Sequence, residues 1–301
     1  MHESIPQQLI TCIELLSMQY SDEDLSKIIS GMKESRKTTL RVNTIKEHRD
    51  NVIKTLHEHH IAFETVPWYQ DALCVSCDEK KIQSLEMYEK GFVYMQNFSS
   101  MIPVMVMQPK ANTDILDMAA APGGKTSLIA ALTEQKAHIT ACEASPIRLV
   151  KLKFNMERQG VKKIAFLLQD ARKLDDFFQF DHILLDAPCS GSGTIVWHDP
   201  KSYQAFSRKL VEKSVELQIE LLRKAVKLLK PGKELVYSTC SILKQENEDV
   251  IKKILQSKSV ELVPIQPIEG LPYIKSSLEG TLLIAPNAYY EGFFIAKLRK
   301  K

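Results

Sequence analysis

The sequence contains no apolar run long enough to cross a membrane. A transmembrane helix requires about 20 consecutive apolar residues, and no segment of the 301 residues approaches that length. The first residues, MHESIPQQL, lack the basic start and apolar segment of a secretory signal. Cysteine is scarce as well, because six residues in a chain of this length are too few for a disulfide scaffold. We therefore expect a cytoplasmic protein with free thiols that needs no membrane.

Charge of one sign is not in large excess either. The 40 Lys and Arg residues against 37 Asp and Glu residues give a net charge of +3. The distribution is uneven, because residues 1–105 carry 11 basic and 15 acidic residues, whereas residues 106–301 carry 29 and 22. The C-terminal two thirds is therefore the better candidate for contact with a polyanion. Lysines that merely solubilise an α/β surface account for the same balance equally well.

Residues 1–105 are predicted to form a small α+β domain. Apolar residues at helical spacing predict a helix over residues 5–16, and Ser21 with Asp24 forms a capping box that opens a second helix. A further capping box, Thr44 with Glu47, predicts a helix that continues through Leu56. Short extended segments are expected at residues 40–42, 61–66, 73–75 and 92–94.

Residues 106–301 show a different pattern, in which apolar strand segments alternate with helical ones. This alternation predicts an α/β domain with a parallel, doubly wound sheet that binds ligands beyond the carboxyl ends of its strands. Two further strands, at 281–284 and 293–298, are expected to close one edge. The predicted strand cores are 115–118, 138–141, 164–168, 182–185 and 235–237, with helices at 145–159 and 204–229, the latter ending at Lys230-Pro231-Gly232.

A small-residue loop, DMAAAPGGKT at residues 117–126, follows the first of these strands and opens a helix. Its glycines, Gly123 and Gly124, allow the backbone to approach a ligand closely, and a helix N-terminus offers free N–H groups. A P-loop would need glycine where the chain has Ala119, and the dinucleotide pattern GxGxxG is absent. The loop is therefore suited to a ligand with a nucleoside and a carboxylate but no pyrophosphate, and S-adenosylmethionine fits that description.

Two acids stand where the next two strands end. Glu143 closes the second strand, where an acid can accept hydrogen bonds from ribose hydroxyls, and Asp170 follows the third strand, where it could accept from an adenine amino group. Each acid taken alone is more often a helix cap or a solvated loop residue. Their shared placement at strand ends favours the ligand-binding interpretation.

Two cysteines follow the fourth and fifth strands. Cys189 lies in DAPCSGSGT at residues 186–194 and Cys240 in STCS at residues 238–241. A free cysteine is usually a small buried apolar residue, but both of these lie in polar loops at the edge that carries the glycine loop. Addition of a thiolate to C6 of cytosine would turn C5 into a nucleophile able to accept a methyl group from a sulfonium. Asp186 is then the candidate for hydrogen bonds to N3 and the amino group of the base, and Lys125 would add positive potential.

These loops, in this order, resemble the signature loops of the Sun/RsmB-type RNA cytosine-C5 methyltransferases. Outer segments are also similar to that family, so that the resemblance covers residues 38–298. It implies a class I S-adenosylmethionine-dependent methyltransferase fold, Rossmann-like, over residues 106–301, and a small RNA-binding domain before it. The outer segments are RVNT at 41–44, QNFSS at 96–100 and EGFFIA at 291–296.

The resemblance also implies a role for each residue. Cys240 is the expected nucleophile, Cys189 assists release of the methylated RNA, and Asp186 and Lys125 complete the catalytic set. The implied substrate is a cytidine in structured rRNA or tRNA, with no metal, and a monomer is the default expectation. The ribose acid is commonly aspartate in the family, and the longer Glu143 can make the same contacts. The cofactor-binding set is Ala120, Ala121, Pro122, Gly123, Gly124, Lys125, Glu143, Asp170 and Asp186.

Two alternatives remain open at this stage. The first is a DNA cytosine-C5 methyltransferase in which Cys189 is the nucleophile. The second is a non-catalytic RNA-binding or assembly protein that keeps cofactor binding for stability. Other signals are weaker, because HEHH at 57–60 lacks the spacing of a zinc helix and Cys74 with Cys77 forms an isolated CxxC. Trp68 and Tyr69 could stack on a base, although a partly buried aromatic pair is the more common finding.

Overall fold

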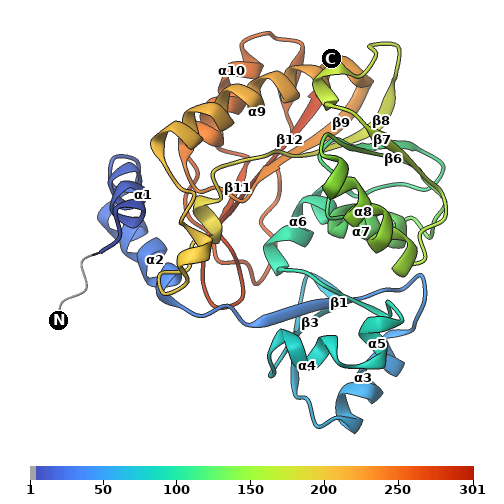
Figure 1. Cartoon of the computed structure of the whole chain (residues 1–301). Coiled ribbons are helices and arrows are strands. Elements are labelled where there is room, and N and C mark those ends of the chain that lie inside the picture. Colours follow the sequence, from blue (N-terminus) through green and yellow to red (C-terminus); the bar gives the residue numbers. More distant parts are fainter. Residues whose placement is uncertain (1–4) are drawn as a thin grey trace.

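Two β-sheets, one small and one large, organise the chain (Figure 1). The computed structural model describes residues 5–301. The small sheet is antiparallel, and α3 (Arg49–Glu58) packs on it through Val52 and Leu56, which share an apolar core with Leu40 and Val42. Two short helices, α4 (Glu79–Gln83) and α5 (Glu86–Glu89), complete this unit. In spatial order its strands are β2 (Phe63–Val66), β3 (Tyr69–Val75), β1 (Thr38–Val42) and β4 (Val93–Met95).

The large sheet has eight strands, five of which form the parallel part expected from the sequence. β12 (Phe293–Lys300) runs antiparallel to its neighbours, and β11 (Leu282–Ile284) pairs only with it on this sheet, which confirms the two predicted closing strands. From edge to edge the remaining order is β10 (Val260–Leu262), β12, β9 (Leu229–Thr239), β8 (Phe180–Asp186), β5 (Asp114–Asp117), β6 (His138–Glu143) and β7 (Ile164–Leu168).

Strand order reverses at β5, which lies between β6 on one side and β8 on the other. In open α/β sheets such a point leaves a crevice at the carboxyl ends of the strands, where ligands bind. Alternating residues of β8 enter opposite apolar cores, Ile183 and Leu185 on one face and Leu184 on the other. Helices cover both faces: α6 (Phe98–Met107), α7 (Gly124–Leu132) and α8 (Pro146–Arg158) on one, α9 (Arg208–Leu228) and α10 (Glu248–Leu255) on the other.

The first two helices pack on the large sheet and not on the small one. Leu9 and Leu16 of α1 (Gln7–Ser17) and Ile28 of α2 (Asp22–Lys33) belong to the apolar core that includes α9 and α10. The hydroxyl of Tyr20, between these helices, donates a hydrogen bond of 2.6 Å to the carbonyl oxygen of Ile242. The division of the chain at residue 105 stays a prediction.

Two local expectations differ from the structure. The capping box at Thr44 and Glu47 is wrong, because α3 begins only at Arg49 and the Glu47 carboxylate accepts from the backbone N–H of His48 and from Asn51. The long helix spans Arg208–Leu228, so it begins four residues later and ends one residue earlier than expected, and β9 follows directly, since Leu229 already pairs with Phe180. The capping box at Ser21 is confirmed, with a hydrogen bond of 3.2 Å from the Asp24 N–H.

No helix within residues 5–301 combines the length and the apolar character that a membrane crossing would require.

Candidate active site

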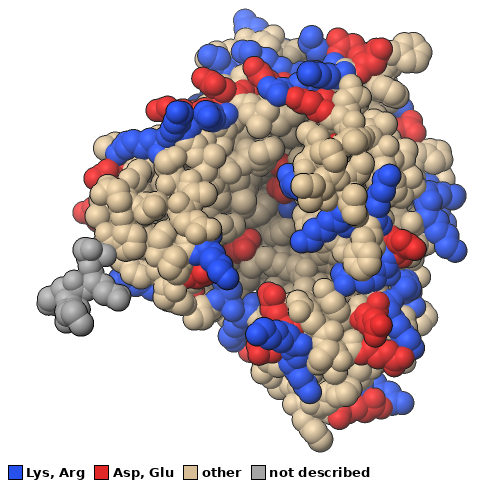
Figure 2. All heavy atoms as spheres, viewed as in Figure 1, with Lys and Arg blue, Asp and Glu red and all other residues tan. Residues whose placement is uncertain are grey.

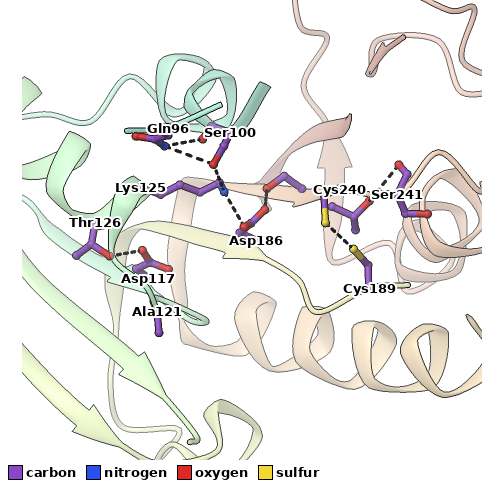
Figure 3. A network of polar contacts seen from close by, with 12 residues as sticks. Gln96, Ser100, Asp117, Ala121, Lys125, Thr126, Asp186, Cys189, Cys240 and Ser241 are labelled. Atoms are coloured by element: carbon purple, nitrogen blue, oxygen red, sulfur yellow. Dashed lines mark hydrogen bonds and ion pairs between the residues drawn. The ribbon is translucent and has the colours of Figure 1, made fainter. Parts of the chain in front are cut away.

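The loops that follow β5, β8 and β9 meet at the carboxyl ends of these parallel strands of the large sheet (Figure 3). β8 and β9 run parallel with Asp186 opposite Ser238, so the two chains leave the sheet at the same level. The glycine loop after β5 approaches from the neighbouring strand. In the space-filling view a hollow opens between the large and small parts of the molecule, with basic and acidic side chains around its rim (Figure 2).

The glycine loop is held in shape by the helix α8. Gly123 has a φ of +107°, a backbone conformation that favours glycine over residues with a Cβ. Asn155 donates a hydrogen bond of 2.8 Å to the Pro122 carbonyl, and Arg148 donates one of 2.7 Å to that of Ala121. The backbone of the loop is therefore fixed, while its small side chains leave space beside it.

That space is a cavity of about 280 Å³ at the switch point of the sheet. It is lined by the small residues Ala119 to Pro122 and by Gly124, together with the acids Asp117, Asp186 and Glu291 and the ammonium of Lys125. Asp117 is buried, and burial raises the pKa of its carboxyl group to about 6 although Thr126 donates a hydrogen bond to Oδ2. Its Oδ1 has no hydrogen-bond partner within the described part of the chain.

Lys125 and Asp186 form an ion pair on the wall of this cavity (Figure 3). The Lys125 Nζ lies 2.7 Å from Asp186 Oδ2 and 2.8 Å from the Ser100 hydroxyl, and Ser238 donates a hydrogen bond of 2.7 Å to Asp186 Oδ1. Burial alone would lower the pKa of Lys125, but the negative charges of Asp186 and of a Cys240 thiolate outweigh it and raise that pKa. The lysine therefore stays charged beside the thiol loop.

The two predicted cysteines meet beyond the ion pair. The Sγ atoms of Cys189 and Cys240 are 3.2 Å apart, within hydrogen-bond distance for sulfur (Figure 3). The hydrogen bond to Cys240 and burial together raise the pKa of Cys189 well above its usual value. The backbone keeps the loops in contact, because the Gly193 N–H donates to the Cys240 carbonyl and the Gly292 N–H donates to the Gly193 carbonyl.

The two predicted nucleoside-binding acids lie outside the lining of this cavity. Glu143 and Asp170 stand at the ends of the neighbouring strands β6 and β7, as expected. Glu143 is buried and accepts a hydrogen bond from the Ser145 N–H, and it lies 3.6 Å from the guanidinium of Arg148. The Asp170 carboxylate is paired with the guanidinium of Arg172 at 2.6 Å, a contact that the sequence did not indicate.

Sequence reasoning gave no role to several side chains that shape the site. Arg41 is fully buried and joins the small sheet to the glycine loop by donating to Gln96, to the Gly124 carbonyl and to Ser127. Ser100 binds Lys125. The RVNT and QNFSS segments contain Arg41, Gln96 and Ser100, so the family resemblance was the signal that could have found them.

Two weaker signals have structural explanations. The Trp68 indole donates a hydrogen bond of 3.0 Å to the Tyr290 hydroxyl and packs edge-on against Phe98, which makes it part of the core packing. Cys74 lies in β3 and is buried. Among residues 5–301 no group of three or more His, Cys, Asp or Glu side chains is arranged to hold a metal ion.

Comparisons with known proteins identify the family and the fold. Residues 104–299 match the family model described as 16S rRNA methyltransferase RsmB/F, and residues 11–78 match that of an RsmF/B-like ferredoxin-like domain. The chain is 35% identical to ribosomal RNA small subunit methyltransferase F of Serratia proteamaculans, over 93% of this chain and 60% of that protein. The chain therefore spans about three fifths of the length of these ribosomal RNA methyltransferase relatives.

Archaeal proteins are similar as well. A tRNA (cytosine(72)-C(5))-methyltransferase of Pyrococcus horikoshii is 39% identical over 73% of this chain and 55% of that protein. Among solved structures, that of NSun6 from Pyrococcus horikoshii with SFG superposes with a TM-score of 0.86 at 27% identity and covers 98% of both chains. A methyltransferase homologue from the same organism is 33% identical with a TM-score of 0.81, over 98% of this chain and 99% of the other.

Proposed function

The chain belongs to the RsmB/F family of RNA methyltransferases, and on that premise we propose that it methylates C5 of a cytidine in structured rRNA or tRNA. The observation that carries the proposal is the pair of thiols, whose sulfur atoms are 3.2 Å apart. Cys189 lies in the same loop as Asp186, which forms the ion pair with Lys125. An enzyme that adds one thiol to a pyrimidine and uses the other to complete the cycle needs this arrangement. The names of the relatives include both rRNA and tRNA enzymes.

The residues present fit S-adenosylmethionine as the methyl donor. The cavity beside the glycine loop is lined by small side chains, and Asp117 Oδ1 is a buried acceptor without a partner among the described residues. Residues 120–124 would contact the donor through backbone groups, Glu143 would bind its ribose and Asp170 its adenine. When bound, the donor supplies an electrophilic methyl group on a sulfonium.

Cys240 is the proposed nucleophile. The ammonium of Lys125 interacts favourably with a thiolate at Cys240, and the thiolate is the reactive form of cysteine. Its sulfur adds to C6 of cytosine, and the electrons of the C5–C6 double bond make C5 nucleophilic. The Asp186 carboxylate accepts hydrogen bonds from the amino group and from N3 when N3 is protonated, and the proton on N3 helps the ring to accept this electron density. After methyl transfer a base removes the C5 proton, the double bond re-forms and the sulfur leaves.

Cys189 is proposed to assist release of the methylated RNA from Cys240. Its raised pKa keeps it as a thiol, so that it carries a proton 3.2 Å from the sulfur that must leave the base. The target nucleotide must leave its stack to bring C6 and C5 to the site, since neither face of a stacked base is free. We therefore expect a cytidine in a loop or bulge, or one flipped out of a helix.

Separate replacement of the two cysteines tests the proposal. Tritium transfer from labelled S-adenosylmethionine to RNA should be abolished in Cys240→Ala, whereas Cys189→Ala should leave protein covalently bound to RNA in denaturing gels. The opposite pattern would assign the nucleophile to Cys189, as in DNA cytosine-C5 methyltransferases. Absence of incorporation by the unaltered protein on total RNA would favour a non-catalytic role. Bisulfite sequencing of RNA with and without the gene would then identify the cytidine.

A further inference from the structure

A buried carboxylate that takes no part in the proposed chemistry lies behind the two cysteine loops. Glu246 follows the Cys240 loop and is fully buried. Four donors point at its two oxygens. The Ser190 N–H donates to Oε1 at 2.7 Å and the Ser190 hydroxyl donates to Oε2 at 2.6 Å. One residue of the Cys189 loop thus makes two hydrogen bonds to the carboxylate.

The same carboxylate also holds the other cysteine loop. The Ser241 hydroxyl donates to Oε2 at 2.6 Å, and Gln218 of α9 donates to Oε1 at 3.3 Å. Gln218 donates in addition to the Pro188 carbonyl at 2.9 Å. Ser190 and Ser241 each directly follow a cysteine, Cys189 and Cys240. A single side chain is thus hydrogen-bonded to the residue next to each thiol.

A carboxylate matches the four donors at this position. It accepts on both oxygens and donates on neither, whereas an amide presents an N–H₂ group at one end. Hydrogen bonds to an ionised group are about twice as strong as neutral ones and shorter, and a buried charge is stable only when its hydrogen bonds are made. The carboxylate therefore adds a charged side-chain link between the loops to the backbone hydrogen bond from Gly193 to the Cys240 carbonyl.

We propose that Glu246 is a positioning residue that locks the Cys189 loop to the Cys240 loop and so fixes the distance between the two sulfur atoms. The inference rests on the proposed function, because the fixed distance matters only if both thiols act in one cycle. The negative charge of Glu246 adds to the hydrogen bond with Cys240 and to burial in raising the pKa of Cys189. Glu246 therefore acts on Cys189 by geometry and by charge, without touching the substrate.

Two substitutions separate these effects. Glu246→Gln removes the charge but keeps the shape, and the serine hydroxyls can turn to accept from the new amide, so we expect it to fold. Glu246→Ala removes the carboxylate link and leaves the backbone hydrogen bond from Gly193 to the Cys240 carbonyl in place. Glu248→Gln is the matched control, because Glu248 is equally buried and accepts from Ser276 and Ser277, which lie outside the cysteine loops.

The first measurement needs neither RNA nor methyl donor. Alkylation of Cys189 by iodoacetamide, followed by peptide mass spectrometry over a range of pH, reports when the thiol ionises. In a Cys240→Ala background we expect Glu246→Gln to move the midpoint to lower pH and Glu248→Gln to leave it unchanged. This result is independent of whether the protein methylates RNA, so it separates failure of the inference from failure of the proposed function.

The second measurement follows turnover. Glu246→Ala should reduce methyl transfer about tenfold to a hundredfold, as expected for the loss of hydrogen bonds to a charged group, and should accumulate the covalent protein–RNA complex, as expected for Cys189→Ala. Variants of Ser190 and Ser241 to Ala should not add to that loss, since all three act through one link. If both glutamate positions lose activity only in proportion to the drop in melting temperature, with no trapped complex and no change in Cys189 alkylation, Glu246 is a core residue and the inference is wrong.

Discussion

Replacement of Lys125 by methionine tests how much activity and stability depend on the Lys125–Asp186 ion pair of the cavity. Lys125→Met keeps the length and the apolar stem of the side chain but removes the ammonium that lies 2.7 Å from Asp186 and 2.8 Å from Ser100. The side chains of Lys125 and Asp186 are only 12% and 27% exposed, so water replaces the lost contacts poorly. The variant therefore leaves a carboxylate without its cation in a narrow cavity.

The expected loss has two parts. Breaking a fully buried pair costs about 3–5 kcal/mol of stability, and the partial exposure of Asp186 reduces the expected cost to about 2 kcal/mol. Removal of a preorganised charge from an active site typically lowers the rate about a hundredfold. Lys125 also contacts Asp186 and Ser100 in the cavity, so we expect kcat to fall about a hundredfold while the fold is retained.

The measurement compares initial rates of tritium transfer at saturating donor with melting temperatures from circular dichroism. Lys37→Met is the control, because Lys37 pairs with Glu64 at 3.3 Å on the surface, where the side chains are 41% and 61% exposed. An exposed pair contributes about 0–1 kcal/mol, so this control should be nearly unchanged. If Lys125→Met keeps more than about a tenth of the wild-type rate, or if the control loses as much, the ion pair does not have the role assigned to it.

Two further predictions follow from single residues. Gly123→Ala should weaken binding of S-adenosylmethionine about tenfold or more in equilibrium dialysis, because a φ of +107° is strained for a residue with a Cβ; unchanged binding would show that the loop shape is not required. Asp117 has a pKa of about 6 when folded against 3.8 as the reference, so its ionisation destabilises the fold as pH rises through about 6. Asp117→Asn should therefore gain up to about 3 kcal/mol relative to wild type between pH 4 and pH 7 in urea unfolding, whereas a difference that is constant with pH would contradict the assigned burial.

The sequence predicted the parts of this site that depend on strand ends. Cys189, Cys240, Glu143 and Asp170 follow buried strands, and parallel strands bring their carboxyl ends to one edge. Alternation of apolar segments with helices predicted the parallel sheet, whereas the order of its strands came from the structure. These predictions depend only on residues close together in the sequence, because the periodicity of a strand or helix and the residues at its end are local features.

Contacts between distant segments could not be predicted in this way. Arg41 reaches Ser127 across 86 positions of sequence, and Gln218 reaches Glu246 across 28. No local sequence pattern indicates which buried polar side chain will hydrogen-bond to which distant residue. Thr44 and Glu47 show a different kind of error. Their spacing is that of a capping box, but the Glu47 carboxylate accepts hydrogen bonds from His48 and Asn51 instead.

The packing of α1 and α2 has a practical consequence for anyone who shortens this protein. The Tyr20 hydroxyl and the amide of Gln19 hydrogen-bond to Ile242 and Gln245, two and five positions after Cys240. A fragment that starts at the small sheet, or at residue 106, would expose the apolar partners of Leu9 and Ile28 and would remove the outer support of that thiol. Expression of the C-terminal region without residues 7–33 should accordingly give a less soluble product, and the amino-terminal helices are best kept with the candidate active site that they support.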